Sequence, residues 1–109
     1  MTTTNLTTPT GVTSIDLTDD GFFVEPSLWT EAMVVELAAR EGVDTMADDH
    51  WKVVRFMRNE YLTKGTGPSV RALGKASGVS VKDLYLLFPK GPAKVAARIA
   101  GIPKPKGCI

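Results

Sequence analysis

Residues 69–89 read SVRALGKASGVSVKDLYLLFP, and this stretch decides the fold that the sequence predicts. Apolar side chains at helical spacing indicate two short helices, over residues 69–76 and 80–88. Ser80 is suited to cap the second helix, and Gly78 lies in the turn between the two. Two short helices about a turn that contains glycine are typical of a helix-turn-helix unit.

Three more helices are predicted on either side of this unit. Apolar stripes over residues 26–41 and 48–64 stop at glycine-containing segments, which end helices. A last helix opens at Pro92, a residue favoured in the first turn, and ends near Gly101. The sequence therefore predicts a mainly α fold, a small helical bundle of about five helices with a helix-turn-helix portion.

The two ends of the chain do not read as helices. Residues 1–13 contain seven threonines and few large apolar groups, so we expect a disordered tail. Residues 14–24 alternate apolar and polar side chains around a turn, which predicts a short N-terminal β-hairpin. The prolines of residues 102–109 exclude a helix and predict a flexible, extended C-terminal arm. Residues 14–101 then form one helical domain.

The charges are unevenly divided along the chain. Residues 1–60 hold 11 acids and 4 bases, whereas residues 61–109 hold 9 bases and one acid, Asp83. Either something anionic contacts the basic half, or the two halves attract each other within the fold. Composition leaves both explanations open.

Several classes of function are disfavoured. One Cys and one His in 109 residues form neither an intramolecular disulfide nor a zinc site. His50 has no serine in evident register for a hydrolytic triad, and residues 65–68 lack the Gly-Lys-Ser/Thr of a phosphate-binding loop. We find no membrane span and no signal-peptide pattern, and a free thiol without an export signal points to the cytoplasm.

The residue that carries chemistry is Cys108, next to the end of the chain. A side chain there is hard to bury and easy to present, and nearby lysines favour the reactive thiolate whereas the terminal carboxylate opposes it. Lys90, Lys94 and Arg98 recur every four residues and would lie along one face of the last helix, either as a docking surface or as a solvated face. The predicted site comprises Cys108 as nucleophile; Gly101, Pro103, Pro105 and Gly107 for arm geometry; and Lys90, Lys94, Arg98, Lys104 and Lys106 for contacts with a partner or an anion.

Residues 87–94 (LFPKGPAK) and 99–109 (IAGIPKPKGCI) strongly resemble the C-terminal motif of the DsrC/TusE family of sulfur-carrier proteins. The similarity extends upstream through residues 68–73, His50-Trp51 and Leu28-Trp29. It implies a small helical bundle with a helix-turn-helix portion, an N-terminal hairpin and a mobile C-terminal arm. It also implies that the next-to-last cysteine, here Cys108, is the functional residue.

One position departs from the pattern of family members that serve dissimilatory sulfite reductase. Those members carry a second cysteine eleven positions before the penultimate one, where this chain has Ala97. The chain therefore resembles the single-cysteine, TusE-like branch. For that branch the resemblance implies a sulfurtransferase, monomeric on its own and without a cofactor, that carries a persulfide on Cys108. It implies a TusBCD- or DsrEFH-like sulfur donor and, as acceptor, a tRNA 2-thiouridylase with its tRNA, for thiolation of the wobble uridine.

Two alternatives stay open. A single-cysteine DsrC-like protein of dissimilatory sulfur metabolism would use the same relay with sulfite reductase as partner. Residues 69–89 also resemble the helix-turn-helix of TetR-type repressors, in which Lys75 and Lys82 would contact DNA phosphates. Against DNA binding, the second helix is expected to present mainly Leu84, Tyr85 and Leu87, and Cys108 would have no role.

Overall fold

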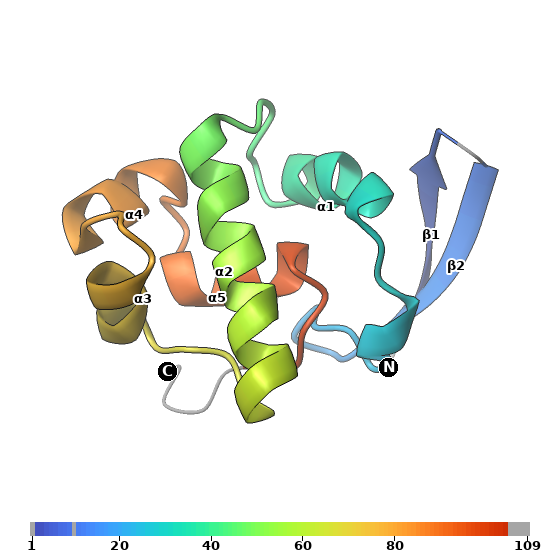
Figure 1. The fold of residues 1–109 in the computed structure, drawn as a ribbon. Coiled ribbons are helices and arrows are strands. Elements are labelled where there is room, and N and C mark those ends of the chain that lie inside the picture. Colours follow the sequence, from blue (N-terminus) through green and yellow to red (C-terminus); the bar gives the residue numbers. More distant parts are fainter. Residues whose placement is uncertain (1, 10, 105–109) are drawn as a thin grey trace.

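Helices α2 (Asp48–Lys64) and α5 (Pro92–Ile99) lie against each other at the centre of the molecule. The computed structural model describes residues 2–9 and 11–104. Helices α3 (Val70–Ala76) and α4 (Val81–Leu87) pack at one end, and α1 (Val34–Arg40) covers α5 on the side of the hairpin (Figure 1). The five helices confirm the predicted helical bundle. Within the described residues, no helix combines the length and the apolar character needed to cross a bilayer.

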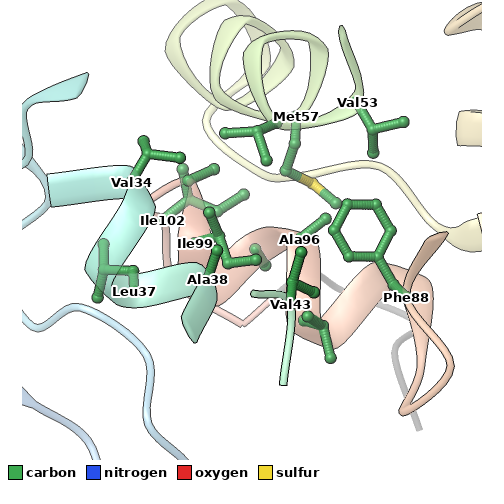
Figure 2. Close-up of a cluster of buried hydrophobic side chains, with 14 of the residues drawn as sticks. Val34, Leu37, Ala38, Val43, Val53, Met57, Phe88, Ala96, Ile99 and Ile102 are labelled. Atoms are coloured by element: carbon green, nitrogen blue, oxygen red, sulfur yellow. The ribbon is translucent and has the colours of Figure 1, made fainter. Parts of the chain in front are cut away.

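The core is built around α5, six of whose eight residues are buried and apolar, three of them alanines. Figure 2 shows Ala96 and Ile99 of α5 facing Met57 of α2, with Val34 of α1 on the opposite side. Small side chains let the neighbouring helices approach α5 closely. Ile102 is also fully buried, so the packed domain extends past residue 101 and the predicted arm begins after Ile102, one residue later than expected.

The helix-turn-helix prediction is confirmed in its position and in its Ser80 cap, and the structure adds a second cap at Ser69. The Ser69 hydroxyl accepts the Ala72 N–H, and the Ser80 hydroxyl accepts the Asp83 N–H, which satisfies amide groups left free at each helix start. A Cβ at Gly74 would lie 2.4 Å from a methyl carbon of Val81. Glycine at position 74 therefore allows α3 and α4 to pack in direct contact.

The N-terminal hairpin is present but lies earlier in the chain than expected. Strands β1 (Thr2–Thr8) and β2 (Gly11–Leu17) pair antiparallel from Thr2–Leu17 to Thr8–Gly11. The expected disordered tail over residues 1–13 is therefore wrong for the residues that the structure describes. Leu6 and Ile15 are buried in the core, and β-branched threonines fit the exposed face of a strand. The predicted pairing across residues 18–21 is reduced to one bridge, between Leu17 and Phe23.

The first predicted helix, over residues 26–41, is interrupted. Two short 3₁₀ helices, Pro26–Leu28 and Glu31–Met33, precede α1, and Trp29 between them has extended backbone angles. The reason is tertiary: the Trp29 indole N–H donates to the carbonyl of Ile99, 2.8 Å away, at the end of α5. This long-range contact is the starting point of the candidate site.

Candidate functional site

The C-terminal end of α5 is the root from which the cysteine-bearing segment continues. The Gly101 N–H donates to the Arg98 carbonyl and the Ile102 N–H to the Ala97 carbonyl, the pattern of a Schellman cap. Gly101 has φ of +66°, a conformation that costs glycine little. Gly101 thus reverses the chain direction at the end of α5: Ile102 packs into the core, and Pro103 is half-buried.

Two side chains clamp this root from outside. The Arg58 guanidinium on α2 donates from Nη1 to the carbonyls of Ala100 and Gly101, both at 3.2 Å, and from Nη2 to that of Pro26 at 2.9 Å. It also stacks 4.5 Å from the Trp29 ring centroid. The Trp29 indole and the Arg58 guanidinium together donate to three successive carbonyls, those of Ile99, Ala100 and Gly101. We call this pair the Trp29–Arg58 clamp.

The clamp is partly withdrawn from solvent. Burial lowers the pKa of the Arg58 guanidinium from its ordinary value, and Tyr61 opposes that shift. Burying a cation is costly unless its donors are satisfied. The carbonyls of Pro26, Ala100 and Gly101 accept from the guanidinium and so offset the cost of burying Arg58. A surface hollow of about 240 Å³, lined by Trp29, Glu31, Arg55, Arg58 and Asn59, lies beside the clamp.

The predicted nucleophile lies outside the described residues. Cys108, Pro105, Lys106 and Gly107 belong to residues 105–109, of which the structure gives no description. Pro103 is half-buried and Lys104 exposed at the end of the described chain. The structure therefore defines the root of the arm, and the role of Cys108 stays a prediction.

The predicted basic face of the last helix is not a single surface. Lys90 precedes α5, and its ammonium end lies against Gly42 at the end of α1. Arg98 points into the molecule: it donates to the Asp20 carbonyl at 2.8 Å and to the Glu41 carboxylate at 3.1 Å, and it stacks on a phenylalanine ring. Arg98 thus has a structural role instead of the expected partner contact.

Lys104 also contacts the acidic half of the chain, since its ammonium lies 3.8 Å from the Asp20 carboxylate. Arg98 and Lys104 together connect the basic half to the turn that contains Asp20, so attraction between the halves accounts for part of the charge division. Lys94 is half-exposed on α5 and forms no ion pair among the described residues.

His50 has a structural role in the fold. Its Nδ1 accepts the Ala47 N–H at 3.0 Å, so Nε2 carries the proton and donates to the Leu87 carbonyl, also at 3.0 Å. The ring meets Phe88 edge-on. His50 therefore ties the start of α2 to the end of α4. Among residues 2–9 and 11–104, no three His, Cys, Asp or Glu side chains gather as a metal site.

Replacing Arg58 with methionine is expected to lower the free energy of unfolding by about 2–3 kcal/mol, because the change strips charged donors from three carbonyls. Urea denaturation monitored by tryptophan fluorescence measures it. Arg55→Met is the matched control, since Arg55 is exposed, pairs with Glu31 at the surface and stacks over Trp51, but donates to no backbone carbonyl among the described residues. Equal, small effects of both changes would contradict the clamp.

The clamp was not predicted from the sequence. The sequence pattern predicts Trp29 as part of an apolar stripe, and Arg58 is one of the four bases of residues 1–60. The available signal was the arginine that directly follows the buried Met57 on α2, which places a cation at the edge of the apolar stripe. Nothing local indicates that its acceptors lie 42 and 43 residues further along the chain.

Most of this chain matches known proteins. The family described as DsrC like protein matches residues 10–109. Sulfurtransferase TusE of Salmonella typhimurium is 45% identical over 102 residues, which cover 87% of this chain and 93% of that protein. The Escherichia coli K12 protein of the same name is 43% identical with the same coverage.

A solved structure agrees with these sequence relatives. The DsrC/gamma subunit of dissimilatory sulfite reductase from Pyrobaculum aerophilum superposes with a TM-score of 0.76 at 36% identity, over 97% of this chain and 95% of that one. Both its fold and the family match extend across the helical bundle and the root that the clamp holds. This chain belongs to the DsrC-like family.

Proposed function

We propose that this protein is a sulfurtransferase that carries sulfur as a persulfide on Cys108 and passes it to an acceptor. The observation that carries the proposal is the position of the cysteine: it lies seven residues beyond Gly101, where the Trp29–Arg58 clamp holds the chain as it leaves the domain. The curated relatives named sulfurtransferase TusE support the same activity. The sulfur atom is the cargo of the reaction, and the proposal requires no resident cofactor.

The transfer is an exchange between sulfur atoms. The Cys108 thiolate attacks the terminal sulfur of a donor persulfide, R–S–SH, so a new S–S bond forms at Cys108 while the S–S bond of the donor breaks. The donor leaves as the thiolate R–S⁻, and the proton stays on the transferred sulfur. No net oxidation or reduction occurs, and the same exchange, run toward an acceptor thiolate, unloads Cys108. A reducing compartment such as the cytoplasm keeps the unloaded thiol free.

The pathway we propose is 2-thiolation of the wobble uridine of tRNA, with a TusBCD-like complex as donor and a tRNA 2-thiouridylase with bound tRNA as acceptor. The support is the name TusE, carried by both bacterial relatives. The clamp contributes by fixing where the arm starts, so that partners meet Cys108 within a limited distance of one surface. Such positioning raises the effective concentration of the reacting group.

A second candidate is a role with dissimilatory sulfite reductase, favoured by the structural similarity to DsrC of Pyrobaculum aerophilum. Against it, Ala97 occupies the position at which the family resemblance implies a second cysteine for that pathway, and this residue is fully buried in α5. A chain with one cysteine has no second thiol to release bound sulfur as an intramolecular disulfide.

Intact-protein mass spectrometry tests the proposal. The reduced chain is incubated with a cysteine desulfurase, free cysteine and the donor complex, and in parallel with inorganic polysulfide alone. We expect a gain of one sulfur atom, about 32 Da, reversed by a mild reductant. Cys108→Ser should show no gain and the same melting temperature. A wild-type chain that gains no sulfur from either source would contradict the proposal.

A further inference from the structure

The outward face of α4 exposes apolar side chains, although a methyl group of Val81 also packs against Gly74 of α3. Leu86 is 71% exposed, Tyr85 52% and Val81 41%. Leu84 and Phe88 of the same segment are fully buried. The expected outward set of Leu84, Tyr85 and Leu87 is thus correct only for Tyr85, because Leu87 is half-buried. We call Val81, Tyr85 and Leu86 the α4 patch.

Cations lie on α4 and on the elements next to it. Lys82 lies on α4 itself, while Arg71 and Lys75 are exposed on α3, which packs against α4 (Figure 1). Lys52 of α2 reaches the turn between them: a Cβ at Gly78 would lie 3.0 Å from its ammonium nitrogen. Asp83 is the single acid of residues 61–109, whereas Asp48 lies one helical turn before Lys52 on α2. Exposed cations therefore lie on and next to the helix that carries the α4 patch, and we call Lys52, Arg71, Lys75 and Lys82 the ring of cations.

Unlike five other cations of the chain, these four have no carboxylate partner among the described residues, a property they share with Arg58, Lys90 and Lys94. Ion pairs hold Arg40, Arg55, Lys64, Arg98 and Lys104 to carboxylates of the same chain. None of the cations in the ring forms an ion pair within residues 2–9 and 11–104. A surface that exposes apolar groups together with unpaired charge of one sign is complementary to a partner with an apolar centre and acidic rim.

We propose that the α4 patch and its ring of cations dock the protein that loads Cys108 with sulfur, through an apolar patch bordered by carboxylates on that protein. The inference rests on the proposed function for the identity of the partner. Apolar burial at Tyr85 and Leu86 supplies affinity, and the ring of cations supplies orientation and rate of encounter. The helix-turn-helix then serves protein recognition.

The chemistry of the patch favours protein over nucleic acid. A recognition helix reads base edges with hydrogen-bonding side chains, whereas the most exposed apolar side chain of α4, Leu86, has no hydrogen-bonding group. A second copy of this chain is also disfavoured at a symmetric contact, because the same ring of cations would face itself. Both occupants are distinguishable by experiment.

Binding of the TusBCD-like donor complex tests the proposal independently of sulfur transfer. The Cys108→Ser variant, which cannot be loaded, is titrated with the complex by calorimetry. Adding Leu86→Glu is expected to raise Kd at least about tenfold. Leu62→Glu is the matched control, because Leu62 lies on α2 and is 65% exposed, and it should leave Kd within about twofold. Lys75→Glu and Lys82→Glu should weaken binding most at low salt.

Several results would overturn the α4 proposal. The first is an equal rise in Kd for Leu86→Glu and Leu62→Glu, and the second is that Cys108→Ser does not bind the donor complex. The third is that the chain dimerises in sedimentation experiments and that Leu86→Glu abolishes the dimer. Binding of duplex DNA that Lys75→Glu abolishes and Leu86→Glu spares would assign the face to nucleic acid. If only the proposed function failed, the result would be different. Binding of the donor complex would still depend on Leu86, but the wild-type chain would gain no sulfur from the complex or from polysulfide.

Discussion

Replacing Gly101 with alanine is expected to lower the free energy of unfolding by about 3–5 kcal/mol, a large share of the stability of a domain this size. A Cβ at this position would lie 2.2–2.7 Å from three Trp29 carbons, so the indole must move. Its movement breaks the hydrogen bond to Ile99 and the stacking with Arg58. The positive φ of +66° adds strain for any L side chain.

The measurement is urea denaturation, with Gly65→Ala as the matched control. Gly65 has a similar φ of +79° at the end of α2, but a Cβ there would meet nothing within 4 Å. This variant therefore isolates the conformational cost, about 1–2 kcal/mol. If both variants lost the same stability, contact with Trp29 would contribute nothing and the clamp would not constrain Gly101.

Replacing Phe88 with alanine is expected to cost about 3–5 kcal/mol, because the ring is fully buried and its removal leaves a cavity between α4, α5 and α2. The edge contact with His50, at 5.2 Å between centroids, is lost as well. The expected fall in melting temperature is about 15 °C or more.

Leu86→Ala is the control for Phe88→Ala, since the two residues lie two positions apart and only one is buried. Leu86→Ala should change the free energy of unfolding by no more than about 0.5 kcal/mol. The pair therefore tests which side of α4 faces the core. A large loss of stability for Leu86→Ala would mean that the α4 patch is covered within the molecule, which would also contradict its docking role.

We expect a carrier protein whose helical domain holds the start of the C-terminal segment in place. The core around α5 and the Trp29–Arg58 clamp fix the point at which the chain leaves the domain, and Cys108 follows within seven residues of Gly101. Relay of a persulfide needs access to the thiol, and it needs partners to dock reproducibly near it. The clamp and the α4 patch would divide these tasks, one setting the origin of the arm and the other orienting the loading protein.

Several errors in the sequence interpretation share a cause. Threonines that suggest disorder by composition form a strand, because Leu6 inserts into the core next to Ile15. Arg98, which reads as a surface cation at regular spacing, binds Glu41 and the Asp20 turn. In each case the deciding partner lies far away in the chain, and single-sequence periodicity reports only neighbours within a few residues.

The sequence by itself determined the ends of α2 through α5, the helix-turn-helix and the resemblance to a sulfur-carrier family. Capping serines, helix-ending glycines and Pro92 act through hydrogen bonds and dihedral angles within a few residues, so their effect is local. The tertiary structure alone decided that Trp29 interrupts the first helix, that Arg58 holds the root of the arm and that Leu86 faces outward. Each of these depends on which distant group fills a contact, and that choice is made by packing of the whole core.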